Sequence, residues 1–373
     1  MTNRKTVLVL LAALCLAAAP PLRADGPEAP KDPKPEAVTV RFGGLLQVQA
    51  DGGDRGDSRF PDSDVRFYLR RARASANATL PQGFDLRLEV ELAGSLSSTS
   101  SLRAQLTDAW VGWAGKGPVR VRAGQLKTPF GYEQLLADPR MTTIERALGN
   151  DRLTPGRQVG VQLHGDLLGK RVTWAAGAFG GSGVNTTSNE DGTLLYAARI
   201  AGSAWKGSLG GAEATLSAGA NGFVSEEKGL ALPADFGLDS TPATPAADNL
   251  LTGRRSGAGV DLQLSGKRLE LSAEALLVRL EPDAALPQSG FDASSVALFA
   301  GWEVIPKRLQ LVARADRFDP NGDRSGDETS TLTLGGNWYV RGHDLKLQAN
   351  LLASDVPVLG RQYKVVARIQ AAF

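Results

Sequence analysis

The stretch RQYKVVARIQAAF, residues 361–373, decides the fold of this chain. Because side chains in a strand point alternately to opposite faces, its residues separate into two sets. One set is apolar without interruption and consists of Tyr363, Val365, Ala367, Ile369, Ala371 and Phe373. The opposite set is Gln362, Lys364, Val366, Arg368 and Gln370. An apolar face that continues to an aromatic last residue indicates an outer-membrane barrel, which must pair its last strand with its first.

Similar strands precede this one along the chain. Alternating segments separated by turn residues predict strands near 38–50, 64–80, 83–94, 106–115, 118–126, 157–167, 170–181, 192–204, 212–224, 254–265, 268–280, 291–305, 308–318, 329–341, 344–354 and 361–373. The count of about sixteen is even, as in bacterial outer-membrane barrels. We therefore predict an all-β protein whose residues 38–373 form a transmembrane antiparallel β-barrel.

The links between these strands alternate between long and short. Long links fall at 51–63, 95–105, 127–156, 182–191, 225–253, 281–290 and 319–328, and shorter ones, such as 81–82, 116–117 and 266–267, lie between them. A membrane barrel has this order because its periplasmic turns only reverse the chain, whereas its outer loops extend into the medium. The longest link, 127–156, is the third outer loop.

The polar faces of the strands predict a water-filled interior. In FDLRLEVEL, residues 84–92, apolar residues alternate with Asp85, Arg87, Glu89 and Glu91. Four charges on one strand face would ordinarily contact solvent, and in a closed barrel that solvent is the lumen. Aromatic residues near strand ends predict an interfacial girdle made of Trp110, Trp113, Trp302, Trp338 and Tyr339.

The N-terminal segments have the composition of export signals. Residues 1–24 carry Arg4 and Lys5, an apolar run and small residues, which predicts a signal peptide. Residues 25–37 are rich in proline and charge, which predicts an extended periplasmic lead-in. We thus expect the protein in the outer membrane of a Gram-negative-type bacterium, in contact with its lipid. Cys15 is the only cysteine and lies in the signal, so disulfides and thiolate sites are excluded from the mature chain.

Three segments together resemble the phosphate-selective porin family, porins O and P. They are residues 67–93, with the pair Arg70-Arg71, residues 108–135, with GQLKTPFG, and residues 142–167, with IERALGN and PGRQVGVQ. The resemblance implies a sixteen-stranded homotrimer whose third outer loop folds inward. It also implies that small anions such as phosphate pass along a ladder of arginines, with no cofactor and no nucleic acid involved.

Candidate residues for the anion path follow from the resemblance and from strand parity. By position, Arg70, Arg71 and Arg146 match the arginines of the family. Second choices on the polar faces of strands are Arg66, Arg120 and Arg122, and the long loop adds Lys127 and Arg140. Guanidinium groups suit this task because they stay charged and offer several planar donors. Equally, Arg66, Arg120 and Arg122 could form ion pairs across strands with Asp85, Glu89, Glu91 or Asp108.

The adjacent pair Arg70-Arg71 also predicts a β-bulge. In a regular strand one of the two would face lipid, at a cost of about 2–4 kcal/mol near the midplane. The apolar positions change from odd (Phe67, Leu69) to even (Ala72, Ala74) at this pair. We therefore expect an extra residue here that turns both arginines into the lumen.

Departures from the family leave its solute open. Gln134 and Pro139 stand where phosphate-selective members carry lysines, and Leu45 stands where they carry an arginine. We expect a porin for small anions, with phosphate or polyphosphate as the more specific possibility and a general diffusion porin as the alternative. An outer-membrane hydrolase is less favoured because the chain has two histidines, His164 and His343, and no hydrolase motif. A secreted binding protein would bury the apolar faces instead of presenting them to lipid.

Overall fold

The computed structural model describes residues 37–93, 104–115, 117–181, 183–186, 189, 192–238, 249–283 and 289–373. The predicted signal peptide (1–24) and all but the last residue of the predicted lead-in (25–37) lie outside the described residues, as does part of the 225–253 link. Residues Val38–Phe373 form one compact unit. Within the described residues, no helix combines the length and the apolar character needed to cross a membrane.

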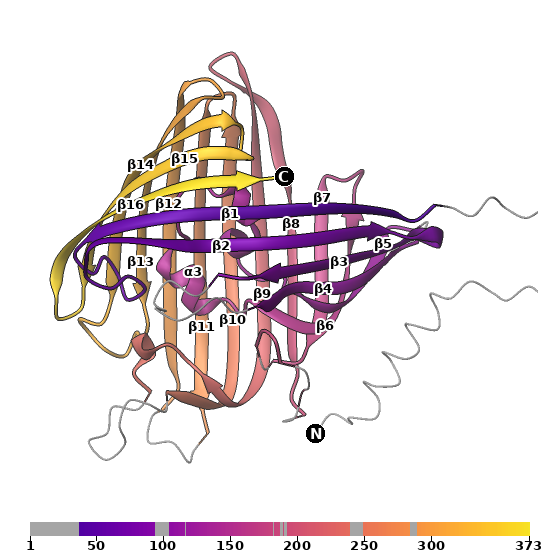
Figure 1. The fold of residues 1–373 in the computed structure, drawn as a ribbon. Helices are drawn as coiled ribbons and strands as arrows, with labels where there is room; N and C mark the ends of the chain where they lie inside the picture. The colour runs from indigo at the N-terminus through magenta and orange to yellow at the C-terminus, as the bar shows by residue number, and fades with distance from the viewer. Residues whose placement is uncertain are drawn as a thin grey trace, which may run out of the picture. The chain divides into compact units, whose positions relative to one another are not determined.

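Sixteen antiparallel strands form a closed barrel in which each strand pairs with its neighbours in sequence (Figure 1). The strands are β1 (Thr39–Gly53), β2 (Ser63–Thr79), β3 (Phe84–Glu91), β4 (Gln105–Ala114), β5 (Val119–Lys127), β6 (Arg157–Leu167), β7 (Val172–Phe179), β8 (Leu195–Leu209), β9 (Ala212–Ala231), β10 (Leu250–Gly266), β11 (Leu269–Pro282), β12 (Phe291–Ile305), β13 (Leu309–Asp319), β14 (Thr329–Arg341), β15 (Leu345–Val356) and β16 (Gly360–Ala372). The barrel closes where β1 pairs with β16, from Leu45 opposite Ala372 to Gly53 opposite Lys364. The predicted fold class and strand number are confirmed.

Strand β16 has the two faces that its sequence predicts. Lys364, Arg368 and Gln370 are buried, whereas Val365 and Ile369 are 56% and 54% exposed. This inverts the pattern of a soluble protein, because the exposed face is the apolar one. The girdle prediction is partly wrong: Trp302 and Trp338 are exposed on the outer face, but Tyr339 is buried and donates a hydrogen bond to Gln310 inside the barrel.

The predicted bulge in β2 is confirmed. Gln47 pairs with Arg71 and Val48 pairs with Leu69, so that Arg70 is the extra residue. Arg70 donates to Glu145 and Arg71 donates to Gln47. The bulge therefore brings two neighbouring arginines to the same side of the sheet, which a regular strand cannot do.

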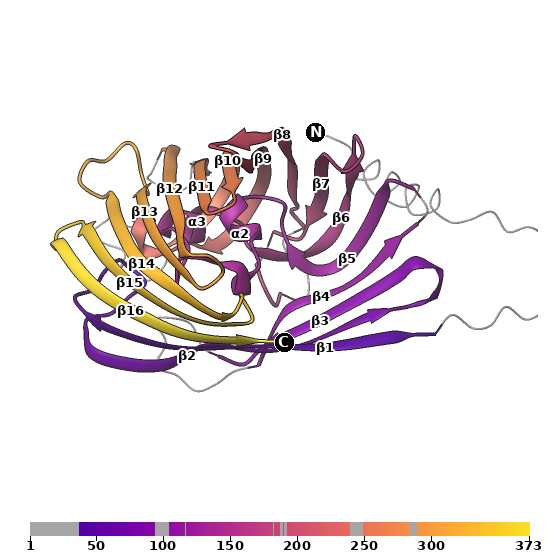
Figure 2. The ribbon, with the colours of Figure 1, turned by 90° about the horizontal axis from the view of Figure 1, so that it is seen from above.

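The third outer connection, residues 128–156, runs inside the barrel (Figure 2). Its ends meet where the Thr128 amide donates to the Gly156 carbonyl, 2.9 Å away. It contains three short helices: α2 (Tyr132–Leu135), η2 (Asp138–Arg140) and α3 (Leu148–Leu153). Polar side chains of the wall satisfy its backbone, as where Asn350 accepts from the Ile144 amide (2.8 Å) and Lys346 donates to the Met141 carbonyl (2.5 Å).

An apolar cluster fills part of the barrel interior, contrary to the expected polar lumen. Phe130, Leu148 and Leu153 of the third connection pack against inward-facing residues of β7–β13 and against Phe236 of η3 (Ala234–Phe236). The ring centroids of Phe130 and Phe223 lie 4.8 Å apart, edge to face. We call this cluster the apolar plug. It exists because wall positions covered by the connection no longer contact water, so that apolar side chains are favoured there.

Candidate functional site

A cavity of about 910 Å³ lies beside the third connection, along the wall formed by β1–β8. Its lining includes Phe42–Leu45 and Phe373 at one end and Leu126, Pro129 and Asp138 at the level of the connection. Six lining side chains are cationic and three are carboxylates: Arg73, Arg87, Arg122, Lys127, Arg157 and Arg199 against Glu89, Asp108 and Asp138. The cavity is thus charged, with an excess of positive groups.

Strand pairing explains why these charges meet. Arg73, on β2, lies opposite Glu91 on β3, and Glu89 lies opposite Asp108 on β4. Lys127 at the end of β5 lies opposite Arg157 at the start of β6. Each strand contributes alternate inward residues, so charges from four or five strands gather on one strip of wall.

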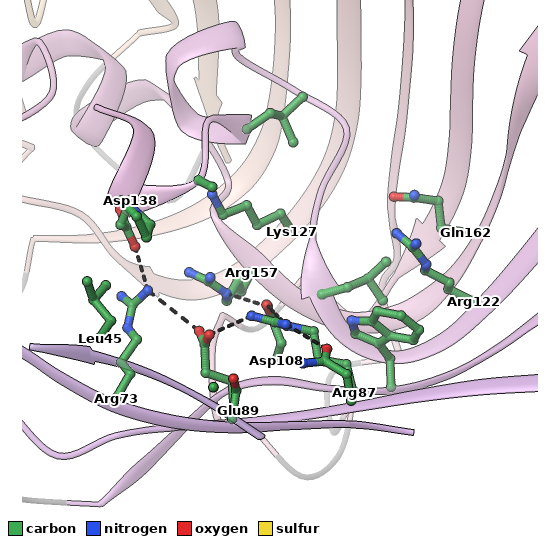
Figure 3. Close-up of a pocket in the computed structure, with 18 of the residues that line it drawn as sticks. Leu45, Arg73, Arg87, Glu89, Asp108, Arg122, Lys127, Asp138, Arg157 and Gln162 are labelled. Carbon is green, nitrogen blue, oxygen red and sulfur yellow. Dashed lines mark hydrogen bonds and ion pairs between the residues drawn. The ribbon is translucent and has the colours of Figure 1, made fainter. Parts of the chain in front are cut away.

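Carboxylates alternate with arginines along this strip (Figure 3). Arg73 reaches Asp138 of the third connection at 2.5 Å and Glu89 at 3.5 Å. Glu89 also pairs with Arg87 at 2.6 Å. Asp108 then joins Arg87 (3.1 Å) to Arg157 (2.7 Å). We call these six residues, from Asp138 to Arg157, the charge strip.

Three cavity cations lie outside the charge strip, and two of them, Arg122 and Lys127, have no carboxylate partner among the described residues. The Arg122 guanidinium lies 4.3 Å from the ring centroid of Trp110, a cation–π contact, and its Nε is buried without a hydrogen-bond partner. Lys127 donates to the carbonyls of Gln134 (2.6 Å) and Leu136 (2.9 Å). Among the described residues, no carboxylate lies within ion-pair distance of either cation. Trp110 faces the cavity, so its predicted place in the interfacial girdle is wrong.

The three first-choice arginines gather where the third connection meets the wall. Arg70 pairs with Glu145 at 2.8 Å. Arg71 and Arg146 both pair with Asp138, at 3.3 and 2.9 Å, and both are buried. None of the three lines the cavity. Their ion pairs attach the third connection to the barrel wall. The part of the three arginines in anion passage stays a prediction.

The other predicted residues are spread over the barrel. Arg122 and Lys127 line the cavity, as described. Arg66 pairs with Asp51 (2.7 Å) and Arg120 pairs with Asp166 (2.7 Å). Arg140 is exposed in η2. The ion-pair alternative therefore holds for Arg66 and Arg120, although with carboxylates other than those expected.

Sequence reasoning missed Arg73, Arg87, Arg157 and Arg199 as lining residues. Two of them carried a signal: Arg87 belongs to the polar face of FDLRLEVEL, and Arg73 shares the inward parity of Arg71 beyond the bulge. Arg199 pairs with Asp261 at 2.5 Å. The missing information was which part of the wall the third connection leaves uncovered.

The carboxylates of the third connection differ in protonation behaviour. Arg71, Arg146 and Arg73 hold the pKa of Asp138 well below its usual range, against the opposing effect of burial. Arg70 and Arg368 lower the pKa of Glu145 in the same way. Burial raises the pKa of Glu133, although Arg314 opposes this. Asp138 and Glu145 thus serve as ionised anchors for the arginines of the wall.

The described residues offer little for metal or acyl-transfer chemistry. They contain no group of three or more His, Cys, Asp or Glu side chains that could hold a metal ion. Burial lowers the pKa of His343 to about 4, and its Nδ1 lies 3.4 Å from the Lys346 ammonium. Within the described part of the chain, no serine hydroxyl forms a hydrogen bond with either histidine.

Comparison with protein families gives one match over more than half of the chain. The sequence model described as "Phosphate-selective porin O and P" matches residues 40–234. No curated protein matches this sequence.

Solved structures with a similar fold are outer-membrane channels and proteins. The anion-selective porin from Comamonas acidovorans has a TM-score of 0.61 and 16% identity, covering 90% of this chain and 100% of that chain. The outer-membrane expressed OmpT of Vibrio cholerae has a TM-score of 0.61 and 13% identity, covering 91% and 99%. The outer-membrane channel DcaP of Acinetobacter baumannii has a TM-score of 0.54 and 16% identity, covering 90% and 97%. At these identities the likeness concerns the fold.

Proposed function

This chain belongs to the family of phosphate-selective porins O and P, and on that premise we propose that it passes small anions through the cavity beside the third connection. It is an outer-membrane porin, a channel and not an enzyme. What we propose is the charge and the chemical class of the solute, and the residues that select it.

The observation that carries the proposal is the excess of cations in the cavity. Six cationic side chains line it against three carboxylates. Arg122 has no carboxylate partner among the described residues, so its charge acts on whatever enters. An anion is thereby favoured over a cation of the same size.

The chemistry of these two groups suits transient binding. Arg122 has one face against Trp110, so an anion meets the edge of its guanidinium, where the planar donors match a carboxylate or phosphate. Lys127 already donates to two backbone carbonyls and therefore has fewer donors left for an anion. Two moderate sites can pass an ion onward, because neither holds it strongly.

Reconstitution of the protein in planar bilayers tests the proposal. We expect an anion-selective reversal potential in a KCl gradient. Arg122→Gln should lower the chloride-to-potassium permeability ratio roughly fivefold, which corresponds to about 1 kcal/mol. Arg120→Gln is the matched control, because Arg120 also faces inward but is paired with Asp166 and does not line the cavity. Absence of conductance, or cation selectivity of the wild type, contradicts the proposal.

Phosphate specificity is the finer hypothesis, and a general diffusion porin is its alternative. The family supports phosphate, whereas the resemblance implies that Gln134, Pro139 and Leu45 stand where phosphate-selective members carry basic residues. Block of chloride current by added phosphate distinguishes the two. In a phosphate-selective pore, phosphate should block the chloride current at phosphate concentrations far below the chloride concentration. In a general porin, phosphate should not block the current.

A further inference from the structure

The charge strip contains more negative charge than an anion path requires. Arg73, Arg87 and Arg157 lie in sequence along the cavity wall, as the rungs of an arginine ladder would. Between them lie Glu89, shared by Arg73 and Arg87, and Asp108, shared by Arg87 and Arg157. Each gap between rungs is therefore already occupied by a carboxylate of the protein.

We propose that Glu89 and Asp108 are specificity-determining residues of this pore, which act as internal counter-anions and keep phosphate from binding to the arginines of the charge strip. The inference rests on the proposed anion porin and deepens it. It assigns the weak binding of phosphate to two carboxylates of the pore wall.

The geometry favours the internal carboxylates over a diffusing ion. Glu89 is fixed by the Thr107 hydroxyl, which donates to its Oε1 at 2.7 Å, and by Arg87 at 2.6 Å. Asp108 holds Arg87 and Arg157 with separate oxygens, Oδ2 and Oδ1. Both are already positioned when the barrel folds, whereas a phosphate ion would lose translational freedom to replace them. Carboxylate oxygens also use the same guanidinium edges that phosphate needs.

The carboxylates leave Arg122 as the contrasting case. It lies in the same cavity without a carboxylate partner, so it can meet an anion without displacing one (Figure 3). The pore would thus combine one available arginine with four compensated ones, because Arg199 is paired with Asp261. Such a pore passes small monovalent anions readily and holds multivalent phosphate weakly, because a multivalent anion needs several available cations together.

Neutralisation of Glu89 or Asp108 should leave the arginines of the charge strip free to bind anions. In the reconstituted full barrel, Glu89→Gln and Asp108→Asn should each raise the chloride-to-potassium permeability ratio roughly threefold or more, since each removes one charge close to the path. Inorganic phosphate should block chloride current at a correspondingly lower concentration in both variants. Asp108→Glu, which keeps the charge, should behave as the wild type.

A variant that adds a negative charge gives a second test. Because it removes no ion pair, it is less exposed to loss of folding than the neutralising variants. Arg87 donates to the Asn77 carboxamide oxygen at 2.8 Å, so Asn77→Asp adds a fourth carboxylate beside the charge strip without leaving a cation unpaired. It should lower anion selectivity and weaken block by phosphate. Asp355→Asn is the control for a general charge effect, because Asp355 pairs with Arg361 at a position about half exposed.

The outcomes separate the inference from the proposed function. If the wild type prefers cations or does not conduct, the porin proposal itself fails. If the wild type prefers anions but Glu89→Gln, Asp108→Asn and Asn77→Asp leave both permeability ratio and phosphate block unchanged, only the role of the internal carboxylates is overturned. A shift of equal size in Asp355→Asn would also overturn it.

Discussion

At the scale of single residues, Glu145 is the strongest attachment of the third connection to the wall. It accepts from Arg70 at 2.8 and 2.9 Å and from Arg368 at 2.5 Å, and it is 5% exposed. Glu145→Gln would leave the buried guanidinium of Arg368 and the partly buried one of Arg70 without their carboxylate, at a cost of about 3–5 kcal/mol. We expect a lower free energy of unfolding in urea and a noisier single-channel current. A variant as stable and as quiet as the wild type would contradict this role.

The same carboxyl group predicts how the effect depends on pH. The folded-state pKa of Glu145 is depressed, so its contribution to stability is present above its unfolded pKa and is lost as pH falls through the folded value. The stability difference between wild type and Glu145→Gln should thus be constant from neutral pH to about pH 5 and shrink in more acidic solution. Urea titrations of both proteins across this range measure it, and a constant difference down to pH 2 would argue against an ionised Glu145.

The sequence could predict the residues of the wall better than their partners. The bulge at Arg70 followed from a change of parity within a few residues, which is local information. The carboxylate partners of Arg70 and Arg71 are Glu145 and Asp138 of the third connection, about 65–75 residues further along the chain. Their positions depend on how that connection folds against the interior, and no local pattern contains this.

At the scale of elements, the third connection and the apolar plug form one unit. Phe130 is fully buried against Phe223 and other inward-facing residues. Phe130→Ala should lower the free energy of unfolding by about 3–5 kcal/mol and should widen the distribution of single-channel conductances, because the connection loses its apolar anchor. Phe84→Ala on the outer face, where Phe84 is 39% exposed, is the matched control. Equal effects of the two substitutions would show that the plug has no special role.

One sequence pattern weakly indicates the apolar plug. Strand β11 contains Ala275-Leu276-Leu277-Val278, where apolar residues follow one another without alternation. Leu276 and Val278 are buried inward, whereas Leu277 is 51% exposed on the outer face. A strand with two apolar faces indicates that something apolar covers its inner side. The sequence does not say what covers it, because the covering residues come from 128–156 and from η3.

At the scale of the whole molecule, the resemblance to the phosphate-selective porins predicts an assembly of several chains. We propose that the protein forms a homotrimer in the outer membrane, as its resemblance to the phosphate-selective porins implies. Purified protein should have three times the mass of the mature chain by light scattering corrected for detergent. It should also shift in gel mobility on heating, because a closed membrane barrel stays folded in sodium dodecyl sulfate until the sample is heated. A monomeric mass at all protein concentrations would contradict the trimer.

The pairing of β1 with β16 has a consequence for the rate of folding. Gln47 and Gln370 are hydrogen-bonded across this seam although 323 positions separate them. Relative to a hairpin that closes about ten residues, such a span is about five doublings of loop length, which adds about 3 kcal/mol of entropic cost. The fifteen neighbouring pairings reduce this cost if they form beforehand, because they already bring the two edges together. The seam should therefore form last, and substitutions there should slow closure of the barrel more than equivalent substitutions between consecutive strands.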